Sequence, residues 1–222
     1  MKWLFDSDHS GPALTARRIW RTGVVTALLL GMSWTAGSAG AADGAAVVVQ
    51  QVADAVVAVL ADKSLSADQK RGKIEGIVYA HFNFSTLSRL VLARNWKQFS
   101  PEQQKTFTEE FKRHLSMTYG KNVESYNNEK AVVIGERQEA GGDWTVKTKI
   151  VRSSAPEILV DYRLRQEDGV WKVIDVIVEG VSLVANFRSQ FQEIVTSKGP
   201  QKLIDLLREK NAHGEPMKAP KA

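Results

Sequence analysis

The 222-residue sequence contains no cysteine, which excludes a disulfide framework, a thiol nucleophile and thiolate metal ligands. Histidine is scarce as well. Of the four histidines, His9 and His213 lie near the ends of the chain, and neither His81 nor His114 is followed by a second histidine at metal-ligand spacing. We therefore expect no metal site and no cofactor.

Several signatures of catalytic sites are also missing. The sequence has no G-x-S-x-G nucleophile elbow, no S-x-x-K pair and no glycine-rich phosphate loop between a strand and a helix. Ser182 is expected to cap a helix, His81 to be packed or hydrogen-bonded, and His114 to lie on a helix flank. Asp175 is expected to have a structural role, with a functional carboxylate as the alternative. No catalytic residue is predicted.

Charge of one sign does not dominate the sequence. Residues 1–42 hold four Lys or Arg and two Asp, so their removal lowers the formal net charge from +5 to +3. Basic and acidic residues are interspersed, without the basic stripe typical of nucleic-acid binding. Nucleic acid is therefore not an expected partner.

The N-terminal region has the three-part pattern of a secretory signal peptide. Arg17, Arg18 and Arg21 precede an apolar run over 24–30, and small residues follow, with a cleavage site near Ala41/Ala42. This apolar run is too short for a stable membrane span of about 20 residues. The pattern predicts a signal peptide over 1–42, one domain over 43–210 and a flexible polar tail over 211–222.

Helical periodicity covers the first half of the domain. Apolar residues recur at helical spacing from Val48 to Leu60, and Ser66 with Gln69 has the form of a capping box that opens a second helix. A third helix is predicted to be capped by Ser85 and to run to Trp96. A fourth is predicted to follow Ser100, with Pro101 in its first turn, and to end at Gly120.

Alternation of apolar and polar residues begins after residue 130. It predicts strands over 130–137, 144–150, 158–164 and 171–178, joined by turns as an antiparallel meander. Two more helices are predicted after this sheet, one following Ser182 and the other from Pro200. The expected fold class is α+β, with a four-stranded antiparallel sheet packed against N-terminal and C-terminal helices.

Three blocks of the sequence resemble the MlaC, or toluene-tolerance (Ttg2D), family of periplasmic phospholipid-binding proteins. These blocks are residues 171–191, 79–96 and 100–120, and the resemblance extends over roughly residues 45–210. Asn83 departs from the family pattern, which more often has Asp there, so a carboxylate role cannot be carried over to this position.

The resemblance implies a soluble, monomeric periplasmic carrier that holds a glycerophospholipid by its acyl chains. It would exchange the lipid between an outer-membrane lipoprotein–porin complex and an inner-membrane MCE-domain ABC transporter complex, and so maintain outer-membrane lipid asymmetry. Two alternatives stay open. One is an exported enzyme with a cone-shaped α+β pocket in which Asp175 and His81 converge, and the other is a structural adaptor with a solid core.

The resemblance also implies an apolar cavity between the sheet and the helices. Composition alone favours ordinary core packing for each apolar residue of the two layers, since any helix-on-sheet domain buries such a set. The residues expected to line the cavity are Phe82, Phe84, Leu87, Leu90, Val91, Phe107, Phe111, Tyr119, Val160, Tyr162, Val173, Val176, Val178, Leu183, Val184, Phe187 and Phe191.

Overall fold

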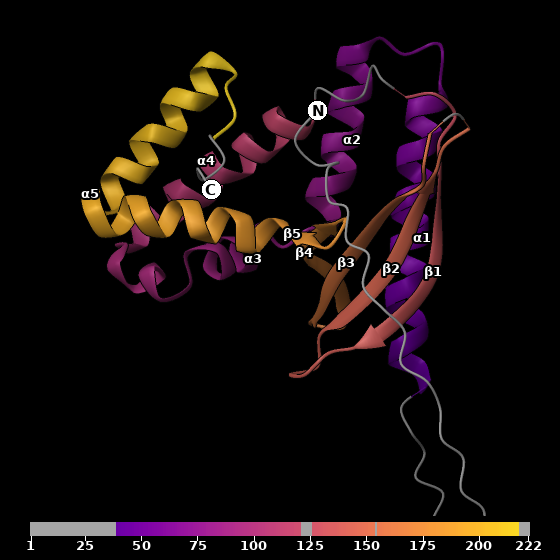
Figure 1. Ribbon diagram of the computed structural model, residues 1–222, viewed down its shortest axis with the longest axis horizontal. Coiled ribbons are helices and arrows are strands. Elements are labelled where there is room, and N and C mark those ends of the chain that lie inside the picture. The colour runs from indigo at the N-terminus through magenta and orange to yellow at the C-terminus, as the bar shows by residue number, and fades with distance from the viewer. Residues whose placement is uncertain (1–38, 121–125, 154, 218–222) are drawn as a thin grey trace, which may run out of the picture. The chain divides into compact units, whose positions relative to one another are not determined.

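Strands that follow one another along the chain lie side by side in one antiparallel sheet, with helices before and after it in the sequence (Figure 1). The computed structural model describes residues 39–120, 126–153 and 155–217. The predicted signal peptide lies, up to residue 38, outside the described residues. The α+β class predicted from the sequence is confirmed.

The helical segments before the sheet agree with the predicted order. They are α1 (Ala39–Ala61), α2 (Ala67–His81), α3 (Phe84–Leu92), the 3-10 segment η1 (Ala93–Gln98) and α4 (Pro101–Gly120). The predicted third helix to Trp96 is thus divided into α3 and η1, because Ala93 has a positive φ of 48° that interrupts the α-helix.

The sheet contains the four predicted strands and one short addition. Its order is β1 (Lys130–Gln138), β2 (Trp144–Val151), β3 (Ile158–Glu167), β4 (Val170–Val178) and β5 (Val181–Ser182). The two residues of β5 pair with Ile177 and Val178 of β4. Glu179 and Gly180 make the turn between them with φ of 49° and 80°, which explains the glycine at this position.

Side-chain caps fix the starts of the helices. Ser66 forms the predicted capping box with Gln69 at the start of α2, and Ser182 caps α5 (Leu183–His213) by accepting a hydrogen bond from Ala185 N. The prediction that Ser85 caps the third helix is wrong, because Asn83 accepts from Thr86 N instead. Asn83 N donates to Val173 O of β4, which keeps the chain extended up to this residue.

The long α5 contains a break where two separate helices were predicted. Gly199 has φ 79° and ψ 169°, which is not helical, and Pro200 follows it. Proline favours the first turn of a helix and has no backbone N–H to donate. The second half of α5 therefore starts at the predicted place and changes direction relative to the first half.

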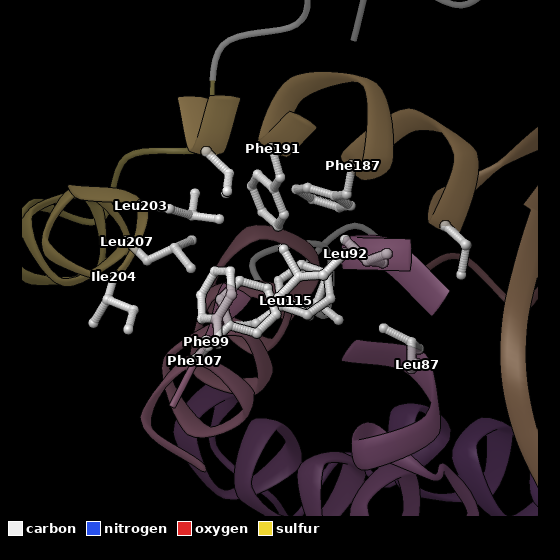
Figure 2. Close-up of a cluster of buried hydrophobic side chains, with 14 residues drawn as sticks. Leu87, Leu92, Phe99, Phe107, Leu115, Phe187, Phe191, Leu203, Ile204 and Leu207 are labelled. Atoms are coloured by element: carbon white, nitrogen blue, oxygen red, sulfur yellow. The ribbon is translucent and has the colours of Figure 1, made fainter. Parts of the chain in front are cut away.

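Apolar side chains of the helices form a packed cluster that we call the helical core (Figure 2). Phe111 lies at its centre, with ring centroids 5.0 Å from Phe187 and 5.4 Å from Phe191. Leu87, Phe107 and Leu203 are also fully buried. These residues come from α3, α4 and both halves of α5, so the helical core joins segments from the two ends of the domain.

A second cluster, which we call the sheet cluster, joins α1 to the sheet. It consists of Ala45, Val49, Val146, Leu164, Trp171 and Val173. Gly44 of α1 lies so close to Trp171 that a Cβ at this position would be 2.6 Å from the indole nitrogen. A glycine is therefore required where α1 passes over the Trp171 ring.

The end of α5 packs on α4 through a buried histidine. The prediction that His114 lies on a helix flank is wrong, since its side chain is fully buried. Its Nδ1 is 3.0 Å from Asn211 Oδ1, and Met217 N donates to its Nε2 over 3.2 Å. Asn211 and Met217, which belong to the predicted flexible tail over 211–222, are thus held against α4, and residues 218–222 of that tail lie outside the described residues.

Candidate functional site: an apolar cavity beside the sheet

A cavity of about 290 Å³ lies between α1, α2 and one face of the sheet. Ile74 and Val78 of α2, together with Phe82, form one wall, and Ile150, Tyr162 and Val173 of the sheet form another. The third wall is one side of α1, made of Val48, Val49, Val52, Ala53, Val56, Val57 and Leu60.

The wall contributed by α1 follows from its sequence. Its lining residues recur every three or four positions, which places them on one side of a helix. From Val48 to Leu60 this stripe is about 18 Å long at 1.5 Å per residue. Among the described residues, α1 is the helix that is apolar enough and long enough to cross a membrane. By length and composition, this holds for its residues Gly44–Ala61. The cavity wall accounts for much of this apolar composition.

Polar side chains gather at one end of the cavity. Tyr126, Glu129 and Lys130 belong to the lining there, and Lys130 is exposed. At the other end, Val49 and Val173 belong to the sheet cluster and are only 4% and 3% exposed. The cavity therefore runs from a buried apolar end to a polar, accessible one.

Gln50 holds α1 against the free edge of the sheet. Its Oε1 accepts from Val133 N over 3.1 Å, and its Nε2 donates to Ala131 O over 3.3 Å. Both groups belong to β1, the edge strand, whose outer N–H and C=O groups need partners. This contact closes the seam between α1 and β1 beside the cavity.

Three of the predicted cavity residues, Phe82, Tyr162 and Val173, line the cavity. The structure brings them together with Ile74 and Val78 of α2. Sequence reasoning did not include the valines of α1. Their apolar stripe was visible as a helix, but nothing in a stripe distinguishes a cavity wall from an ordinary packed face.

The other predicted cavity residues lie outside the lining. Because the aromatic rings of α4 and α5 interlock, they fill the space between these helices with side chains (Figure 2). Tyr119 is 49% exposed, Val160 is buried, Val176 packs against the sheet cluster and Val178 is partly exposed. The helical core contains Leu87, Val91, Phe107, Phe111, Val184, Phe187 and Phe191, with Phe84, Leu90 and Leu183 packed against it.

The two candidate catalytic groups have structural partners. Asp175 Oδ1 accepts from Val176 N and Val184 N over 2.8 and 3.0 Å, and its Oδ2 accepts from Ser182 Oγ over 2.6 Å. Asp175 thereby ties β4 to the start of α5. His81 Nδ1 contacts Ile77 O at 2.8 Å within α2. Neither residue lines the cavity.

Asn83, the departure from the family pattern, has a defined role. Its Oδ1 caps α3, and its Nδ2 donates to Glu167 Oε2 at the end of β3. Thr86 Oγ1 donates to the other oxygen of Glu167 over 3.1 Å. An aspartate at position 83 would place two carboxylates in contact, so the amide suits its partner.

Comparison with known proteins gives consistent results. Residues 50–209 match the family model described as MlaC protein. The toluene tolerance protein ttg2D of Pseudomonas putida is 33% identical over 103 residues, 46% of this chain and 48% of that protein. The intermembrane phospholipid transport system binding protein MlaC of Haemophilus influenzae is 24% identical over 166 residues, 71% of this chain and 78% of that protein. The match spans about half the length of the Pseudomonas relative.

A solved structure has the same architecture. The phospholipid-binding protein from Ralstonia solanacearum, in complex with a phospholipid, aligns with a TM-score of 0.70 at 24% sequence identity. The alignment covers 77% of this chain and 98% of that one. This likeness establishes the shared fold, and the family match covers most of the chain, including all of the cavity lining except Val48 and Val49. The chain belongs to the MlaC family.

Proposed function

We propose that this protein is a soluble periplasmic carrier that binds a glycerophospholipid by its acyl chains. The observation that supports this proposal is the cavity between α1, α2 and the sheet, whose lining is almost entirely apolar. The names of the Haemophilus relative and of the Ralstonia structure, which mention phospholipid transport and phospholipid binding, agree with it.

The energetics of acyl chains explain why a carrier needs such a cavity. Two 16-carbon chains hold about 30 methylene and methyl groups, and exposing them to water costs roughly 20–25 kcal/mol. The apolar stripe of α1 runs for about 18 Å, close to the half of a ~30 Å hydrocarbon core that one leaflet occupies. The apolar wall of the cavity is thus about as long as the hydrocarbon layer of the leaflet from which an acyl chain is taken.

The size of the cavity implies movement of its walls. A volume of about 290 Å³ is just below the range for pockets that hold small ligands, about 300–1,000 Å³. A lipid with two chains therefore requires α1 or α2 to move away from the sheet. The seam closed by Gln50 is one place where the walls can separate.

In the proposed cycle, the carrier receives lipid at one membrane complex and delivers it to another. The family implies an outer-membrane lipoprotein–porin complex and an inner-membrane MCE-domain ABC transporter complex as partners. A carrier must bind lipid about as strongly as the bilayer does, because otherwise either loading or release would fail. Its partners would then supply direction, and the result would be maintained outer-membrane asymmetry. We expect a monomer without catalytic activity.

A charge introduced into the cavity wall tests the proposal. Val56→Glu places a carboxylate in the apolar lining, where an ionised group without a partner is strongly unfavourable. Lipid that co-purifies with the protein from the periplasm, measured by native mass spectrometry, should fall to a small fraction of the wild-type amount.

Val47→Glu is the matched control on the same helix. Val47 is 50% exposed and does not line the cavity, so this variant should keep its lipid. If the wild-type protein carries no lipid, or if the Val56 variant carries as much as the Val47 variant, the carrier function is contradicted.

A further inference from the structure

Lys70 lies on α2, one turn before the part of that helix that lines the cavity. Ile74 and Val78 belong to the lining. Residues four apart lie on the same side of a helix, so Lys70 continues their row about 5.4 Å beyond Ile74. Its ammonium nitrogen Nζ donates to Leu60 O over 2.6 Å, and Leu60 is the last residue of α1 in the lining. Lys70 therefore joins the two helical walls at one end of the cavity.

This end of the cavity is the accessible one. The helices α1 and α2 follow each other in the chain and lie side by side in opposite directions (Figure 1). Val49 of α1 and Val173 of β4 mark the buried end, and Phe82, which follows α2, pairs with Val173. The wall of α1 thus runs from the buried end at Val49 to the accessible end at Leu60. The wall of α2 runs the other way, so Lys70 stands at the accessible end.

The ammonium group of Lys70 has donors to spare. It carries three N–H groups, of which Leu60 O accepts one, and among the described residues none accepts from the other two. The charge of Asp62 acts on Lys70, but it acts on Lys73 as well, and Asp62 Oδ1 already accepts from Ser64 N over 2.9 Å. Lys70 is therefore a partly buried cation, fixed by one hydrogen bond, that forms no ion pair with a described residue.

From this position we infer that Lys70 binds the phosphodiester group of the lipid whose acyl chains occupy the cavity. The inference rests on the proposed carrier function and adds a residue that determines specificity for phospholipids. An ammonium group forms charge-assisted hydrogen bonds with phosphate oxygens, which are stronger than neutral ones. In the described lining at this end, the charges of Lys130 and Glu129 offset each other. Lys70 supplies the additional positive charge that a phosphodiester requires.

The direction of the lipid agrees with the shape of the cavity. With its phosphate at Lys70, the headgroup stays at the accessible end, and the chains run from Leu60 toward Val49 along about 16 Å of apolar wall. Lys70 also has a simpler role, because α1 ends at Ala61 and Leu60 O is among the last carbonyls of that helix. Lysine side chains often bind such carbonyls. This cap alone would affect stability, but it would not distinguish one lipid from another.

The test compares a phospholipid with a lipid that has the same chains and no phosphate. Delipidated wild-type protein and Lys70→Met are titrated with dioctanoyl phosphatidylglycerol and with dioctanoylglycerol. Methionine keeps most of the apolar stem of the side chain but removes the charge. The variant should bind the phospholipid about three- to tenfold more weakly than the wild type and the diacylglycerol with unchanged affinity. Lys70→Arg, which keeps the charge, should retain the wild-type preference between the two lipids.

Lys105→Met is the matched control. Lys105 is exposed on α4 and lies outside the cavity lining, so its removal changes the net charge equally but should leave the lipid preference unchanged. The deacylated headgroup, glycerophosphoglycerol, should not bind measurably, and binding that depends on Lys70 would indicate a site for free anions and overturn the lipid contact.

The melting temperature without lipid separates the cap from the phosphate contact. If Lys70→Met melts at a lower temperature but keeps the wild-type preference, or weakens both lipids equally, the phosphate contact is refuted and Lys70 only caps α1. If the wild-type protein binds neither lipid, the proposed function fails instead.

Discussion

A single buried histidine connects the last turns of α5 to α4. Since Met217 N donates to His114 Nε2, that nitrogen must be an acceptor, and Nδ1 must carry the proton that it shares with Asn211 Oδ1. Asn211 in turn donates to the backbone oxygen and the carboxylate of Glu110. The network is satisfied by a neutral imidazole.

Acidification should therefore destabilise the protein through His114. Burial lowers the pKa of His114 below its ordinary value of 6.5. The unfolded chain then takes up the proton at a higher pH than the folded one, so stability is full above about pH 6.5 and is lost as the pH falls toward the folded-state pKa. Urea denaturation between pH 7.5 and 5.5 should show this decrease.

His114→Phe should remove most of that pH dependence, although its stability at pH 7.5 is lower because Asn211 and Met217 lose a partner. His213→Gln, at an exposed position of the same region, should keep the wild-type profile. An unchanged slope in His114→Phe would assign the effect to other groups.

Single residues were predictable from the sequence where their partners are close in the chain. Ser66 and Ser182 cap helices as expected, since each needs a donor only three residues away. His114 was not predictable, because its partner Asn211 is 97 residues distant. The role of Asn83 depends on Glu167, which is 84 residues distant. Local pattern contains no information on such pairs.

At the scale of elements, the break inside α5 depends on one glycine. Gly199→Ala should destabilise the protein by about 1–3 kcal/mol, because the backbone conformation at φ 79° and ψ 169° is accessible essentially to glycine alone. Thermal denaturation followed by circular dichroism would measure the loss.

Gly72→Ala, a glycine-to-alanine substitution inside a regular helix, should have the opposite effect on the stability of the protein. Gly72 lies within α2 with open space around its Cβ position, so alanine should stabilise the protein by about 0.5–1 kcal/mol. If both variants shift stability in the same direction, the conformational explanation for Gly199 is wrong.

Elements were largely predictable from periodicity. The change from helical spacing to alternation located four strands to within a few residues, because one face of each strand is partly or fully buried. The cavity wall was less predictable. The rings of Phe107, Phe111 and Phe187 were expected in the cavity but form the helical core, whereas the smaller valines of α1 leave space beside the sheet. How completely side chains fill a space depends on tertiary packing.

At the scale of the whole molecule, the predicted signal peptide has a direct test. We expect the protein isolated from the periplasm to begin at Ala42 or Asp43, as determined by N-terminal sequencing or intact mass. Cleavage there removes the first residues of α1 but none of the cavity wall, which starts at Val48. A protein that retains residues 1–42 and stays in the cytoplasm would contradict the proposed location.

The route of the chain through the two clusters determines the order in which they can form as the chain emerges into the periplasm. The sheet cluster needs α1 and the strands β2, β3 and β4, so its contacts are complete once β4 has been added. The helical core must wait for α5, and Arg188 reaches Leu90 O across 98 residues. Until α5 follows the meander into the periplasm, the apolar sides of α3 and α4 stay uncovered. The nascent chain thus has its greatest need of a chaperone over that interval.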